Sequence, residues 1–186
     1  MKSRGERFFA WASRVFAIGG IGVLCFLLLL YACGARINRT NSLPKGIYWV
    51  VHKQPERGDI VLFWPGDCAE MRMARERGYI YEGVFNHANG VGYGLLMKRF
   101  LGLPGDVVSV ADDGIHINGS LIPNTKPLLC DNIGDPLPYL RFTGYTLKEN
   151  EAFFVSDHLP RSFDARYFGV QKTNQIVDVV VPVYVW

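Results

Sequence analysis

The chain has 186 residues, a formal net charge of +3 and an apolar content of 49%. Its length allows one globular domain once a membrane segment is subtracted. The charge does not indicate a nucleic-acid-binding protein, because no run rich in Lys or Arg occurs after the N-terminus. Many Gly, Pro and aromatic residues favour short strands and turns over a helical bundle.

An uncharged apolar run extends from Val15 to Ala35. At about 1.5 Å per residue, such a helix crosses a hydrocarbon core of roughly 30 Å. The preceding charges are mostly positive, and positive flanks stay in the cytoplasm. The sequence therefore predicts a cytoplasmic segment 1–14, a transmembrane anchor 15–35 and a periplasmic domain 36–186, in the inner membrane of a bacterium.

Two other interpretations of this run remain open. A cleaved signal peptide has an apolar stretch of about 7–15 residues, which is shorter than the run observed. The residues around Cys33 also faintly resemble a lipoprotein processing site, although Tyr31 fits that pattern poorly. In each case the downstream domain is exported.

The exported part predicts a mainly β domain with short helices. Residues 36–44 are polar and predict a loop. Runs rich in β-branched and aromatic residues predict strands, and these are residues 46–51, 60–64, 95–101, 107–110, 152–155 and 176–184.

Three connecting regions complete this prediction. Residues 67–77 favour a short helix capped by Asp67, with Glu70 at the capping-box spacing. Asn118-Gly119 predicts a hairpin within residues 114–122. Residues 83–94 and 123–146 are rich in turn formers and predict loops.

The cysteines allow one disulfide. Cys68 and Cys130 lie in the exported part, where oxidation is permitted, and a bond between them is a hypothesis. Cys25 and Cys33 lie in the apolar run. There is no C-x-x-C motif or His cluster, so we expect no metal site, and no cofactor is predicted.

A serine in a stiffened loop is the first candidate for chemistry. Pro44 fixes its own backbone and favours an extended Leu43, so Ser42 could be presented in a fixed direction just outside the membrane. A loop serine by itself is more often structural or solvent-exposed.

Lys98 is the second candidate, because it follows three apolar residues in a predicted strand. If its side chain turns inward, burial lowers the pKa of the amine, and a neutral amine can take a proton from a serine hydroxyl. The alternative is a Lys98 that points to solvent on an alternating strand. Arg99 cannot act as the base because its guanidinium stays charged.

The segment 156–169 is the third candidate. Asp164 and Arg166 are two residues apart and could form an ion pair on one face of an extended segment; an ordinary charged surface loop is the alternative. His158, with Asp157 to orient it, could assist acid–base chemistry. The other histidines, His52, His87 and His116, are predicted in turns or at the surface.

Taken together and in order, these segments resemble the successive motifs of type I signal peptidases. The motifs are Ser-x-Pro-x-Gly from Ser42, Gly58-Asp59, Lys98-Arg99 with Gly105-Asp106, and Ser162-x-Asp-x-Arg166. The longer strings NRTNSLPKGIYWV and SDHLPRSFDARYFG look like those of the conjugative-transfer signal peptidases of the TraF type. The resemblance covers residues 36–186 and implies a signal peptidase-like β domain.

The resemblance also implies roles for individual residues. Ser42 matches the nucleophile and Lys98 the general base. Ser162 matches the serine that orients the lysine amine, and Thr40 matches the hydroxyl donor to the oxyanion. Asp164 and Arg166 match the ion pair that braces the site. Leu43 and Ala165 depart from the usual residues of the family without altering the Ser–Lys pair.

The implied activity is that of a serine endopeptidase that processes, and in the TraF type cyclises, a pilin precursor for conjugation. Inner-membrane lipid and other proteins of a conjugation system are its expected partners, and nucleic acid is not. Two alternatives stay open: a general signal peptidase acting on secretory preproteins, which the short segment 114–146 argues against, and a non-enzymatic scaffold for pilus assembly.

Overall fold

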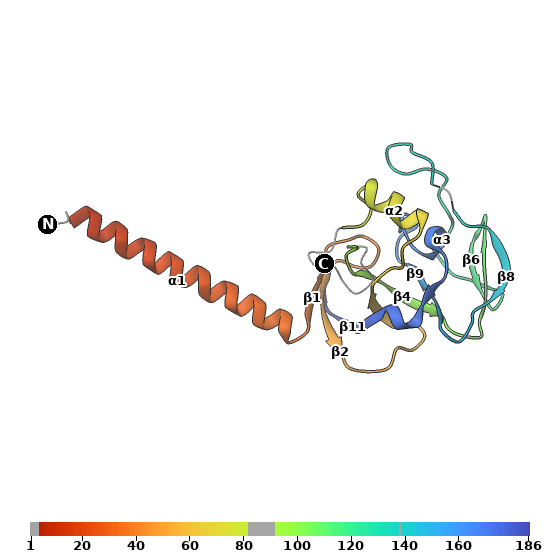
Figure 1. Cartoon of the computed structure of the whole chain (residues 1–186), viewed down its shortest axis with the longest axis horizontal. Helices are drawn as coiled ribbons and strands as arrows, with labels where there is room; N and C mark the ends of the chain where they lie inside the picture. Colours follow the sequence, from red (N-terminus) through yellow and green to blue (C-terminus); the bar gives the residue numbers. More distant parts are fainter. Residues whose placement is uncertain (1–3, 82–91, 138) are drawn as a thin grey trace. The chain divides into compact units, whose positions relative to one another are not determined.

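A computed structural model describes residues 4–81, 92–137 and 139–186 (Figure 1). The chain divides into two compact units, Met1–Arg36 and Ile37–Trp186. The first is helix α1 (Arg4–Ala32). Its segment Trp11–Ala32 has a mean hydropathy of 2.5 and is long and apolar enough to cross a membrane. The predicted N-terminal apolar helix is therefore present, although it begins before the apolar run.

The second unit is built around a seven-stranded sheet. Its strands, in the order in which they lie side by side, are β1 (Ala35–Asn38), β2 (Gly46–Val51), β11 (Ile176–Val185), β3 (Ile60–Phe63), β4 (Leu96–Gly102), β9 (Glu151–Val155) and β10 (Gln171–Lys172). The pairs from β2 to β10 are antiparallel. The chain therefore brings segments that are far apart in sequence onto neighbouring strands.

The second unit also contains a smaller four-stranded sheet, whose strands β6 and β8 are labelled in Figure 1. Its strands, in spatial order, are β7 (Ser120–Leu121), β6 (Gly114–Ile117), β5 (Val107–Ala111) and β8 (Phe142–Thr146). The predicted hairpin is confirmed: Asn118 and Gly119 have φ of 50° and 80° between β6 and β7, as a type I′ turn requires. The prediction of a loop throughout 123–146 is wrong at its end, because β8 pairs with β5 there.

The short helices are α2 (Ala69–Glu76), α3 (Ala165–Phe168) and the 3₁₀ turn η1 (Thr173–Gln175). The predicted cap of α2 is wrong. Cys68 is the N-cap residue and makes no side-chain capping bond. The Asp67 carboxylate instead accepts hydrogen bonds from Tyr93 (2.7 Å) and Arg72 (2.6 Å). A long-range partner has thus replaced the local capping bond.

Aromatic packing fills the main core between the sheets and the helices. The rings of Phe63 and Phe154 stack with centroids 4.1 Å apart. Gly102 is needed beside them, because a Cβ there would lie 2.6 Å from the Cβ of Phe153. A second, smaller cluster lies around Leu43, Tyr48 and neighbours on β2, β3 and β11.

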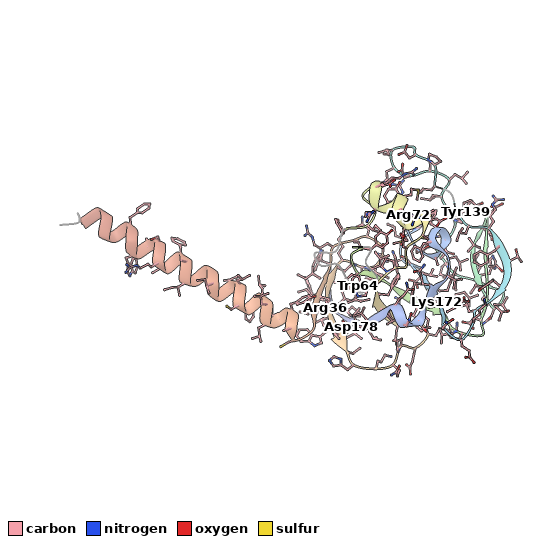
Figure 2. The ribbon with its side chains drawn as sticks, in the orientation of Figure 1. Arg36, Trp64, Arg72, Tyr139, Lys172 and Asp178 are labelled. Carbon is pink, nitrogen blue, oxygen red and sulfur yellow. The ribbon has the colours of Figure 1, made fainter. Side chains whose placement is uncertain are left out.

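Two polar contacts tie together segments of the second unit. Arg57 donates to both Asp106 oxygens, at 2.7 and 2.8 Å, just before β5. At the outer strand β10, Lys172 donates to Glu151 at 3.1 Å, and its side chain is labelled in Figure 2.

The fold class is confirmed as mainly β with short helices. Two further details differ from the sequence-based expectations. Residues 36–38 belong to β1 and not to a loop, and Cys68 and Cys130 both carry free thiols, so the hypothetical disulfide is not formed. Most of the predicted loop 83–94, and His87 within it, lie outside the described residues.

Candidate active site

Lys98 lies in the middle of β4, opposite Val61 of β3, and is only 3% exposed. Alternation along β4 gives it the same side of the strand as buried Phe100. Burial disfavours the charged ammonium and lowers the pKa of Lys98 to about 8, against an opposing effect of Asp164 and with a smaller lowering by Arg166. A substantial share of this amine is therefore neutral near physiological pH.

The Lys98 amine has a defined direction. Its Nζ donates a hydrogen bond of 2.7 Å to Oγ of Ser162, which is itself buried. Ser162 lies in the loop between β9 and α3, 64 residues further along the chain. The tertiary fold thus brings together two residues that the sequence paired only by resemblance.

Ser42 lies in the loop between β1 and β2 and is half-buried. Leu43, which follows it, is 1% exposed and anchors the loop in the second core cluster. Tyr48 donates to the carbonyl of Pro44 at 2.7 Å. The hydroxyl of Ser156 donates to the carbonyl of Ser42. The nucleophile candidate is therefore held from both sides.

Ser156 connects this loop to the strand of Lys98. Strands β4 and β9 pair with Arg99 opposite Val155. Strand β9 ends at Val155, so Ser156 directly follows the residue that pairs with Arg99. The Ser42 main chain is thus one hydrogen bond away from the residue that follows the β9 partner of Arg99, the neighbour of Lys98 in β4.

Asp164 and Arg166 form a fully buried ion pair, with Arg166 Nε donating to Asp164 Oδ1 at 2.8 Å. Asp164 also accepts the N–H of Ser156 at 2.9 Å, and Arg166 donates to the carbonyl of Ser162 at 2.9 Å. The ion pair therefore contacts Ser156, which bonds to the Ser42 carbonyl, and Ser162, which bonds to the Lys98 amine. Its hydrogen bonds satisfy charges that would otherwise be costly to bury.

Thr40 is exposed, and its polar groups face Asn38. Its hydroxyl donates to Asn38 Oδ1 at 2.8 Å, and its N–H donates to the same oxygen at 3.0 Å. A threonine hydroxyl carries one proton, which in this arrangement is directed at Asn38.

The predicted pairing of His158 with Asp157 has a different arrangement. His158 is exposed, and the Asp157 carboxylate accepts a 2.9 Å hydrogen bond from Arg99. Within the part of the chain that the structure describes, no group of three His, Cys, Asp or Glu side chains could hold a metal ion.

Sequence reasoning assigned no role to Asn38, Tyr48 or Ser156, although each makes a hydrogen bond to the loop 40–44. All three lie within the strings that carried the family resemblance. Their long-range and cross-loop partners had no local signal that could have revealed them.

Comparison with known proteins gives a family match over nearly the whole chain. The family model described as signal peptidase, peptidase S26, matches residues 8–186. A plasmid transfer protein TraF of Escherichia coli is 42% identical over 169 residues, covering 91% of this chain and 93% of that protein.

More distant relatives carry two kinds of name. A conjugal transfer protein TraF of Agrobacterium tumefaciens (strain 15955) is 31% identical and covers 81% of this chain and 82% of its own length. Signal peptidase I V of Bacillus subtilis (strain 168) is 31% identical, over 49% of this chain and 58% of that protein.

Proposed function

The chain belongs to the signal peptidase family, peptidase S26, and from this premise we propose that it is a membrane-anchored serine endopeptidase with a Ser42–Lys98 dyad that processes a pilin precursor for conjugative transfer. The observation that carries the proposal is the buried Lys98 amine, whose pKa is lowered to about 8. The names of the relatives, which concern plasmid and conjugal transfer, support the biological role.

The chemistry proposed is acyl transfer. Neutral Lys98 takes the proton of the Ser42 hydroxyl as Ser42 Oγ attacks a substrate carbonyl, so that a tetrahedral oxyanion forms. Lys98 then gives that proton to the leaving amine as the peptide bond breaks, leaving an acyl group on Ser42. Water completes hydrolysis, whereas an amine of the substrate completes peptide-bond transfer and cyclisation.

Three neighbours support the dyad. Ser162 accepts a hydrogen bond from Lys98 and orients the amine. The Asp164–Arg166 pair fixes the loop that carries Ser162. The Ser42 N–H and the Thr40 hydroxyl are the proposed donors to the oxyanion.

Location follows from the apolar helix and the charges beside it. We expect α1 to hold the protein in the inner membrane, with the N-terminus in the cytoplasm and residues after Arg36 in the periplasm. A site carried by a domain tethered in this way would meet substrates that are themselves membrane-bound.

The test uses the full chain in detergent micelles with a purified conjugative pilin precursor and reads the product masses. We expect Ser42→Ala and Lys98→Ala to abolish processing. The exposed residues Ser120 and Lys148 supply matched controls, and their alanine variants should process the precursor at the wild-type rate.

The product masses separate the alternatives. A product one water lighter than the linear peptide supports cyclisation, and a linear product supports simple hydrolysis. Cleavage of varied secretory preproteins with equal efficiency would favour a general signal peptidase, in line with the Bacillus relative. Unchanged pilus formation with Ser42→Ala would refute the proposed peptidase activity and would leave a non-enzymatic role as a scaffold.

A further inference from the structure

The loop of the nucleophile candidate is closed by the side chain of one residue, Asn38. This residue ends β1 and is 4% exposed. Its Nδ2 donates to the carbonyls of Leu43 and Pro44, each at 3.0 Å. Its Oδ1 accepts from the N–H and the hydroxyl of Thr40. One amide therefore joins the two sides of the loop that carries Ser42.

We propose that Asn38 is a positioning residue that acts through Thr40 and the Ser42 loop, holding the oxyanion donor and the nucleophile in register. The inference rests on the proposed function. A buried amide that makes four hydrogen bonds is fully used in this one arrangement, so it specifies one loop conformation. An apolar residue of the same size would fill the space but would specify no single loop conformation.

The Thr40 hydroxyl explains how this positioning serves catalysis. In the resting arrangement its proton is directed at the neutral oxygen of Asn38. When an oxyanion forms nearby, that charged oxygen is the stronger acceptor, because hydrogen bonds to ionised groups are roughly twice as strong as neutral ones. The hydroxyl then turns to the oxyanion, while the Thr40 N–H stays on Asn38 and keeps the residue in place.

Other contacts hold the far side of the loop and should not replace Asn38. Tyr48 shares the Pro44 carbonyl, and Ser156 holds the carbonyl of Ser42. Neither contact reaches Thr40. Loss of Asn38 should therefore free Thr40 selectively, and the defect should appear in turnover more than in substrate binding.

The test is a double-mutant cycle with two variants that keep side-chain shape, Asn38→Leu and Thr40→Val. Each is measured in the full chain in micelles, with a purified pilin precursor, for kcat and KM. Asn41→Ala is the matched control, since Asn41 is an exposed asparagine in the same loop.

We expect each single variant to lower kcat by about a hundredfold to a thousandfold, the scale set by removing one oxyanion donor, with KM within about threefold of wild type. The double variant should fall no more than about threefold below Thr40→Val, because Asn38 acts through Thr40. Fully multiplicative losses, a change confined to KM, or a kcat for Asn38→Leu within twofold of Asn41→Ala would overturn the proposal.

Thermal unfolding of each variant checks that it is folded. If Asn38→Leu does not fold, Asn38→Ala is measured in its place. If neither Asn38 variant folds, the comparison of kcat between Thr40→Ser and Thr40→Val is used. Retained kcat in Thr40→Ser with loss in Thr40→Val supports the Thr40 hydroxyl as the group through which Asn38 acts; wild-type kcat in Thr40→Val refutes the proposal. An active Ser42→Ala would instead refute the proposed function itself, so the two failures are distinguishable.

Discussion

The proposed Ser42–Lys98 dyad predicts a pH dependence of activity that follows from the burial of Lys98. Its pKa is lowered from 10.5 to about 8, and only the neutral amine can accept the Ser42 proton. With a pKa of about 8, roughly 10% of the amine is neutral at pH 7; with an unshifted value the share would be about 0.03%. Burial therefore raises the neutral fraction of the Lys98 amine at pH 7, the active form in the proposed dyad, by a factor of about 300.

The assay is kcat/KM for precursor cleavage between pH 5.5 and 9.5 in micelles at constant ionic strength. Below the pKa of the base, kcat/KM should rise about tenfold per pH unit, and above about pH 8 to 9 it should level off. Lys98→Arg should be inactive at every pH, because a guanidinium does not deprotonate in this range.

One control addresses the competing base. His158→Ala should leave unchanged the pH at which kcat/KM stops rising, because the exposed imidazole is not part of the proposed proton transfer. A kcat/KM profile that levels off near pH 6 to 7 in the wild type, but not in His158→Ala, would refute Lys98 as the general base. A profile without any dependence on pH below 8 would refute it as well.

Three further predictions concern the same cluster. Ser162→Ala removes the 2.7 Å partner of the Lys98 amine, so kcat should fall by about tenfold to a hundredfold with little change in KM; an unchanged kcat would argue against orientation by Ser162. Asp164→Asn leaves Arg166 buried without its carboxylate and should lower the free energy of unfolding by about 3–5 kcal/mol, measured by thermal or chemical denaturation; a loss below about 1 kcal/mol would contradict a buried pair. Lys98→Met should raise stability at pH 7 by up to ~3 kcal/mol, because the folded-state pKa lies below the unfolded value. That cost of the ammonium is present in full below about pH 8 and disappears as the pH rises through 10.5, so the gain should vanish at high pH.

Local patterns in the sequence were enough to predict most strands and one turn. The run GIYWVV forms β2, and Asn118-Gly119 forms the turn of the β6–β7 hairpin. Both depend on properties of a few neighbouring residues: β-branched and aromatic content, and tolerance of positive φ. The apolar run 15–35 likewise predicted a long apolar helix, because its composition alone matches a hydrocarbon core.

Where local patterns failed, a distant partner had supplied the decisive contact. Asp67 has the right spacing for a helix cap, but Tyr93, 26 residues away, holds its carboxylate together with nearby Arg72. The region 123–146 carries turn residues throughout, yet its end becomes β8 because β5 offers an unpaired edge. Chain-local rules contain no information about either partner.

The candidate site shows the same division. The sequence by itself determined which residue types are present, and the order of its motifs pointed to Ser42, Lys98, Ser162 and the Asp164–Arg166 pair. From the β4 segment alone, the pattern favoured an outward-facing Lys98 over an inward one. Only the tertiary structure decided that Lys98 is buried and bonded to Ser162, because this partner lies in a loop 64 residues further along the chain. That burial lowers the pKa of the amine, and it comes from contacts that span more than fifty residues of chain.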